Sequence, residues 1–187
     1  MRSYPTGNRY RMEIINVACY FLLAIIVGGC LNPFAPPLDK SEAESVQIEP
    51  TTPEAVLENF KTAYENRDIN LYLDCLDRDF AFCYFDDEVN RQKCYGLEDT
   101  DIPGERRRTE LLFSIYERIS LEPWQVLSAY ISADSLENRR VLFTLLVEDI
   151  DGLYPTSEAE GYALFKFVQR AGKYYIVLWN DQSISGK

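Results

Sequence analysis

The segment Glu158–Gln169, EAEGYALFKFVQ, sets small or apolar residues at every second position. One face of it carries Ala159, Gly161, Ala163, Phe165 and Phe167. A period of two over this length is typical of a β-strand with one side turned toward a core. The segment therefore predicts a long, half-buried strand in the second half of the chain.

Three further strand candidates lie around this one, at Trp124–Ser132, Arg140–Glu148 and Lys173–Asn180. The links between the candidates are short and rich in turn residues, and Arg170–Gly172 is short enough for a hairpin. We therefore expect the four strands to pair in chain order as an antiparallel meander.

The chain before these strands carries helix signals. Thr51–Glu54 supplies a threonine cap, a proline for the first helical position and an acid for the first turn. Apolar residues then recur at helical spacing as far as Tyr64, and Asp68 or Asn70 can cap a second, shorter helix. Helical spacing returns over Glu105–Ile119 and predicts a third helix.

Between the second and third helices, Asp79–Phe85 is rich in aromatic residues and predicts one more strand. The following segment, Asp86–Gly104, is polar and predicted to be irregular. Two helices, a strand, a helix and four strands indicate an α+β fold, in which N-terminal helices pack on a strongly curved antiparallel sheet.

This element order resembles the nuclear-transport-factor-2-like superfamily, which includes SnoaL-like proteins, over roughly residues 52–182. The resemblance also rests on Pro53–Phe60, on Asp79–Phe82 and on the ending Tyr175–Asp181. These segments look most like those of uncharacterised bacterial lipoproteins with such a domain. The resemblance implies a cone fold, or cystatin-like roll, with a pocket between the sheet and the helices.

The start of the chain has the pattern of an export signal. Three arginines precede an apolar stretch, and Val27–Cys30, VGGC, closes it. These four residues resemble the lipobox of bacterial lipoproteins, which implies cleavage before Cys30 and lipidation of its thiol. The alternative is an uncleaved membrane anchor, but the apolar run Val17–Val27 is shorter than the roughly 20 residues that span a bilayer.

We therefore expect a signal peptide at 1–29, a lipidated Cys30 with a disordered tether at 30–50, and the α+β domain at 51–187. The protein would be anchored by its lipid to the exported face of a bacterial cell membrane. Leu31 is not the aspartate of an inner-membrane retention signal, which favours the periplasmic side of the outer membrane in a diderm organism.

The chain is acidic, with 19 basic and 30 acidic residues and a net charge of −11. Removal of residues 1–29 takes away three arginines and one glutamate, and makes the remainder more acidic still. Such a surface repels the phosphate backbone, so the sequence argues against nucleic-acid binding. The remaining partners are the membrane, through the lipid, a small ligand, an envelope protein, or a second copy bound through the sheet.

The sequence contains no histidine, which removes the commonest general base and metal ligand. Carboxylates and tyrosines remain, and the residues expected near the cone pocket are Tyr130, Tyr162, Glu148 and Asp181. No spacing singles out a catalytic set, so we assign no catalytic residue. We favour a non-catalytic module that binds a small apolar ligand or a protein partner; the alternative is a carboxylate-dependent isomerase, cyclase or hydrolase that uses the cone pocket.

Three cysteines remain after Cys30. Cys83 and Cys94 lie close enough in sequence to form a disulfide, which would leave Cys75 as a buried thiol. Three free cysteines are an equal alternative, because disulfide geometry cannot be deduced from sequence.

No metal or cofactor is expected. The segment 99–110 partly matches a calcium-binding EF-hand loop. However, Pro103 occupies a ligand position, and Arg106–Arg108 would place three cations beside the ion. A turn followed by a helix is the better interpretation of this segment.

The lipidation hypothesis makes a direct prediction. In a bacterial host, Cys30→Ser should leave the precursor uncleaved and abolish incorporation of labelled fatty acid, because the thiol is the acceptor. A Cys75→Ser variant should be processed and labelled normally. Fatty-acid labelling that persists in Cys30→Ser would refute the export interpretation.

Overall fold

The computed structural model describes residues 47–98 and 102–183 of the chain. The predicted signal peptide, Cys30 and most of the predicted tether lie outside these residues. The described residues belong to one compact unit, Glu44–Lys187, which has its own hydrophobic core.

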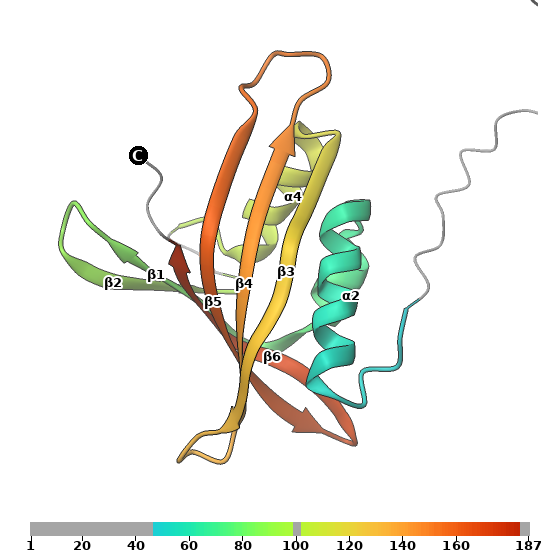
Figure 1. Ribbon diagram of the computed structural model, residues 1–187, viewed down its shortest axis with the longest axis vertical. Helices are drawn as coiled ribbons and strands as arrows, with labels where there is room; N and C mark the ends of the chain where they lie inside the picture. Colours follow the sequence, from blue (N-terminus) through green and yellow to red (C-terminus); the bar gives the residue numbers. More distant parts are fainter. Residues whose placement is uncertain (1–46, 99–101, 184–187) are drawn as a thin grey trace, which may run out of the picture. The chain divides into compact units, whose positions relative to one another are not determined.

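The described residues form three helices and six strands (Figure 1). The helices are α2 (Pro53–Asn66), α3 (Ile69–Asp74) and α4 (Glu105–Ile115). The strands are β1 (Leu76–Asp86), β2 (Arg91–Gly96), β3 (Arg118–Ile131), β4 (Glu137–Glu148), β5 (Ser157–Arg170) and β6 (Lys173–Ser183).

All six strands join one curved sheet in the order β2-β1-β6-β5-β4-β3. The α+β class and the meander β3–β6 are confirmed. The prediction of a purely antiparallel sheet is wrong at one pair, because β1 runs parallel to β6. The chain leaves β1 and reaches β6 only after β2, α4 and three more strands, so no tight turn imposes opposite directions on this pair.

The helix starts follow the sequence signals. The Thr52 hydroxyl accepts a hydrogen bond from Ala55 N at 3.1 Å, and Pro53 opens α2. The Asp68 carboxylate accepts from the backbone N–H groups of Asn70 and Leu71, each at 3.0 Å, and so caps α3. Each cap satisfies N–H groups that the first helical turn leaves without a partner.

The core lies between the inner face of the sheet and the apolar side of α2. On β5, the alternation turns Ala163, Phe165 and Phe167 inward, and each is at most 1% exposed. α2 packs against β3 and β6 and contributes Val56 and Phe60, which are also buried. Burial of these side chains is the main favourable term that holds the helix on the sheet.

The polarity of the segment 86–104 predicted an irregular structure, but part of the segment is a strand. Its residues Arg91–Gly96 form β2, which pairs antiparallel with β1. β2 is an edge strand, so it has one neighbour and little need for apolar side chains. The third helix is also shorter than predicted, because β3 already begins at Arg118.

A bulge in β6 changes which residues face the core. Strict alternation predicts Tyr175 and Val177 on the same face as Trp179. In the structure, the β5–β6 pairing shifts at Val177, and Ile176 lies on the core side and is fully buried. The extra residue of a β-bulge reverses the alternation on one side of it. Trp179 packs against the core but is half-buried, less than alternation alone predicts.

The residues just before α2 are fixed to the domain. Asn59, which is 2% exposed, accepts from Ile48 N at 2.8 Å and donates to Ile48 O at 2.6 Å. Pro50 O accepts from Tyr174 N at 2.7 Å. The packed part of the chain therefore begins before Thr51, and the last residues of the predicted tether belong to it.

These bonds predict a threshold in N-terminal truncation. A chain that starts at Glu49 should be less stable to urea than one that starts at Gln47 by about 1–3 kcal/mol, because the buried Asn59 amide loses both partners. Ile48→Ala in the longer chain is the control. It keeps the backbone bonds, and the side chain is 44% exposed, so its effect should be small. Equal stability of the two chains would contradict the assignment.

Candidate functional site

Among the described residues, side chains fill most of the space between α2 and the sheet. They leave a cavity of about 20 Å³ there. Its walls are Phe60, Tyr64, Leu121, Trp124, Phe143, Leu145, Ala163 and Trp179. A cavity of this size holds about one water molecule. It is too small for a ligand, and no carboxylate is part of its walls.

Aromatic packing around Phe60 fills this interior. The Phe60 ring stacks on Trp124 at a centroid distance of 5.9 Å and meets the edges of Phe165 and Trp179 at 5.5 and 5.4 Å. Tyr64, one turn along α2, lies 5.1 Å from the same ring. These offset and edge contacts are the favourable geometries for aromatic pairs. The indole N–H of Trp179 is buried without an acceptor among the described residues, in keeping with an apolar surrounding.

The two tyrosines predicted near the pocket lie elsewhere. Tyr130 is near the end of β3 and is 48% exposed. Tyr162 alternates with the inward-facing Ala163 and therefore lies on the outer face of the sheet. There its ring lies beneath the guanidinium of Arg140, 4.3 Å from the centroid. Neither residue lines the cone cavity.

The two predicted acids are also outside the cavity. Glu148, at the end of β4, accepts from Arg118 at 2.8 Å in a surface ion pair. Asp181 lies opposite Ala163 in the β5–β6 ladder, so its side chain is on the inner face, beyond Trp179. Asp181 is thus the one predicted residue on the expected face, although it does not line the cavity.

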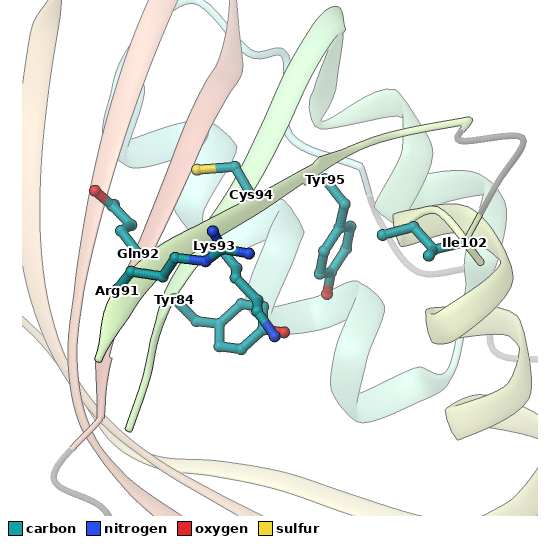
Figure 2. A pocket seen from close by; sticks show the side chains of 7 residues that line it. All are labelled: Tyr84, Arg91, Gln92, Lys93, Cys94, Tyr95 and Ile102. Carbon is teal, nitrogen blue, oxygen red and sulfur yellow. The ribbon is translucent and has the colours of Figure 1, made fainter. Parts of the chain in front are cut away.

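An open groove of about 320 Å³ lies on the β1–β2 hairpin (Figure 2). Its walls are Tyr84, Arg91, Gln92, Lys93, Cys94, Tyr95 and Ile102. Most of these residues belong to β2, and Ile102 comes from the turn before α4 and lies beside Tyr95. The volume is within the range of small-molecule sites, which begins at roughly 300 Å³. We call this hollow the hairpin groove.

Strand pairing places the aromatic and cationic side chains of the hairpin groove on one face. Tyr84 pairs with Lys93, and Phe82 pairs with Tyr95. Directly opposed residues of an antiparallel pair point to the same side. The face continues into the core, because the Phe82 ring meets Tyr95 at 5.1 Å and Trp179 at 4.8 Å. The groove is therefore a surface extension of the inner face of the sheet.

The charges in the hairpin groove are partly organised by Asp86. Its carboxylate pairs with Lys93 Nζ at 2.5 Å and accepts from the backbone N–H groups of Glu88 and Val89. The hydrogen bond from Lys93 lowers the pKa of Asp86 below its usual range. Arg91 lies opposite Asp86 in the ladder and is exposed. Lys93 and Arg91 thus bring two cations to the groove of an acidic protein.

A buried acid, Glu105, lies next to Tyr95. Glu105, the first residue of α4, is 4% exposed and accepts from the Tyr72 hydroxyl, and from Thr109 at 3.1 Å. Tyr95 is hydrogen-bonded to the same carboxylate. Burial and the nearby acid raise the pKa of Tyr95 well above its usual value, so it remains a neutral phenol. The Arg108 guanidinium covers its ring at 4.3 Å.

The hydrogen bonds around Glu105 hold Tyr95 in position. They do not have the arrangement of a catalytic acid and base. A general base must reach the proton that it removes. Glu105 is buried and already accepts hydrogen bonds from two hydroxyl groups. The network therefore fixes the floor of the hairpin groove by joining β2 to α3 and α4.

Cys83 and Cys94 form a disulfide across β1 and β2, with their Cα atoms 4.1 Å apart. The sequence left open either this disulfide or three free cysteines, and the structure has the disulfide. Cys75 is a free, buried thiol, and burial raises its pKa to about 12. Such a thiol is unreactive at neutral pH. The disulfide lies on the face opposite Tyr84 and Tyr95 and ties the two strands of the groove together.

The hairpin groove was not predicted from the sequence, because the polar segment 86–104 was expected to be irregular. One signal was present: Arg91, Lys93 and Tyr95 recur at every second position and so share a face if the segment is a strand. The predicted metal-free character is not tested. Among residues 47–98 and 102–183, no group of three acidic or cysteine residues could hold a metal ion.

Comparison with known proteins supports the fold. No family model and no curated protein sequence matches this chain. A solved structure of a conserved protein from Planctomyces limnophilus DSM 3776 has a TM-score of 0.56 at 14% identity, over 70% of this chain and 92% of that one. A candidate scytalone dehydratase from Novosphingobium aromaticivorans DSM 12444 has a TM-score of 0.55 at 10% identity, over 70% and 80%.

A candidate aromatic ring hydroxylase from Novosphingobium aromaticivorans is also similar, with a TM-score of 0.52 at 12% identity, over 71% of this chain and 87% of that one. These three solved structures share the fold of this chain. The chain therefore has the cone fold, and identities this low carry no further conclusion.

The filled cone predicts a structural role for Trp179. Trp179→Ala should lower the free energy of unfolding by about 3–5 kcal/mol, since it removes a ring from the Phe60 cluster and leaves a hole. Tyr130→Ala, at a residue first expected near the pocket, should change stability by less than about 1 kcal/mol. Urea denaturation measures both values. A small loss for Trp179→Ala would mean that the ring lines an open pocket.

Proposed function

We propose that this protein is a non-catalytic, ligand-binding module of the bacterial cell envelope, and that its ligand binds in the hairpin groove. The observation that supports this is the contrast in volume between the groove, about 320 Å³, and the cone cavity, about 20 Å³. Of these two spaces between described residues, the groove is the one with room for a small molecule.

The walls of the hairpin groove also suit binding. Tyr84, Tyr95 and Ile102 supply apolar contact area, and Arg91 and Lys93 supply hydrogen-bond donors. Sites for small molecules commonly combine apolar walls with a few polar groups that orient the ligand. The disulfide and the Glu105 network hold the groove in shape, which lowers the entropy cost of binding.

The alternative is an enzyme that uses a carboxylate in the cone, as the names of two neighbours, the candidate dehydratase and hydroxylase, would suggest. Such a reaction needs a substrate-sized space with an acid in its wall. The cavity is too small and its lining contains no acid, which favours binding over catalysis.

Attachment to the membrane is part of the proposal and rests on the lipobox-like Val27–Cys30. We propose that the lipid on Cys30 holds the domain at the exported face of the membrane. None of the helices in residues 47–98 and 102–183 combines the length and apolar character that a bilayer crossing requires.

The location of the binding site can be tested with the fluorescent probe 1-anilinonaphthalene-8-sulfonate and a soluble chain that starts at Leu31. This chain keeps the whole packed unit. The probe should bind with one site per chain, and Tyr84→Ala should weaken binding about tenfold by removing a wall. Phe85→Ala is the matched control, because Phe85 is the next residue of β1, on the other face, and is 56% exposed.

Phe85→Ala should leave the affinity for the probe unchanged. Absence of saturable binding to the folded protein would refute the proposed function. An equal loss in both variants would show that the probe binds away from the groove.

A further inference from the structure

We infer that the ligand of the hairpin groove is a small molecule that carries an aromatic ring and a single anionic group, such as a carboxylate or a sulfonate. This inference rests on the proposed function and adds the chemical class of the ligand. Three features support it: the cations of the groove, its tyrosine rings (Figure 2), and the acids in the neighbouring hairpin turn.

The anionic group is indicated by Arg91. Asp86, the acid opposite Arg91 in the ladder, is already engaged by Lys93 and by two backbone N–H groups. Arg91 is exposed, and its guanidinium has five N–H donors, so it keeps donors for a ligand. Guanidinium groups bind carboxylate and sulfonate oxygens through strong, charge-assisted hydrogen bonds.

The aromatic part is indicated by the tyrosines. Tyr84 and Tyr95 are on the same face of the hairpin, with ring centroids 6.4 Å apart. Tyr95 is held in place by Glu105 and Arg108, and the Ile102 side chain lies beside it. A flat ring can therefore pack against surfaces that are ordered before it binds, which favours affinity.

The size and charge of the ligand are limited by the surroundings. Asp87 and Glu88 are in the turn of the hairpin, close in sequence to Arg91, and the whole chain has a net charge of −11. A polyanion such as a nucleic acid would meet these acids and be repelled. A single anionic group can be neutralised by Arg91 alone, and the volume of about 320 Å³ also limits the ligand to a small molecule.

The experiment compares two probes with the same rings on the soluble chain that starts at Leu31. 1-Anilinonaphthalene-8-sulfonate carries a sulfonate, and N-phenyl-1-naphthylamine carries no charge. The sulfonate probe should bind at least about tenfold more tightly, and its affinity should fall as salt is added. Arg91→Gln should abolish the difference, whereas Arg91→Lys should retain part of it.

Arg118→Gln is the control for net charge. Arg118 is another exposed arginine at the start of a strand, paired with Glu148 and outside the groove, so its loss should leave the preference unchanged. Near-ultraviolet circular dichroism checks that each variant is folded. If Arg91→Gln does not fold, Arg91→Lys and the salt titration of the native chain provide the test.

Each of the other outcomes would contradict the anionic class of the ligand, the role of Arg91 or the proposed function. Equal affinity of the two probes, or a preference that salt does not change, refutes the anionic class but leaves the groove as a binding site. An equal loss in Arg91→Gln and Arg118→Gln refutes the role of Arg91. If neither probe binds, the proposed function fails, and the inference fails with it.

Discussion

The packing of Phe60 against the inner face of the sheet is the contact on which the rest of the structure depends. Phe60 comes from α2 and meets residues of α3, β3, β5 and β6, and so joins elements that are far apart in sequence. A cone-shaped sheet must be closed on its concave side, by side chains or by a ligand. Here the aromatic rings close it, and the interior of the fold becomes its core.

Because side chains fill the space between α2 and the sheet, we place the proposed ligand-binding surface outside it, on the β1–β2 hairpin. The inner face of the sheet extends past Trp179 onto the β1–β2 hairpin, where α4 covers it only in part, through Arg108 over Tyr95. There Phe82, Tyr84 and Lys93 lie on this same face, and each is half-buried. One continuous face thus serves as core at one end and as a groove wall at the other, so the hairpin groove lies beside the aromatic core.

Local signals made much of the fold predictable from the sequence. Thr52 and Asp68 cap helices through bonds to residues two or three positions away, and the alternation in β5 follows directly from burial on one side. β2 was not predicted, because a polar edge strand carries only a weak signal of its own and is stabilised by its partner strand and by the Cys83–Cys94 bond. The bulge at Val177 and the Glu105 network also depend on residues distant in sequence, and so the candidate site was missed.

The hydrogen bonds that hold the chain ahead of α2 have a mechanical consequence. Ile48 is bonded to Asn59 on the core helix, and Pro50 is bonded to Tyr174 on β6. A force applied along the chain from its N-terminal side would therefore reach α2 and β6 through three bonds before it reached the helix cap at Thr52. The domain would therefore not rotate freely about the chain just before Thr52. Its orientation relative to the direction of pull would be set by the line that joins these two attachment points.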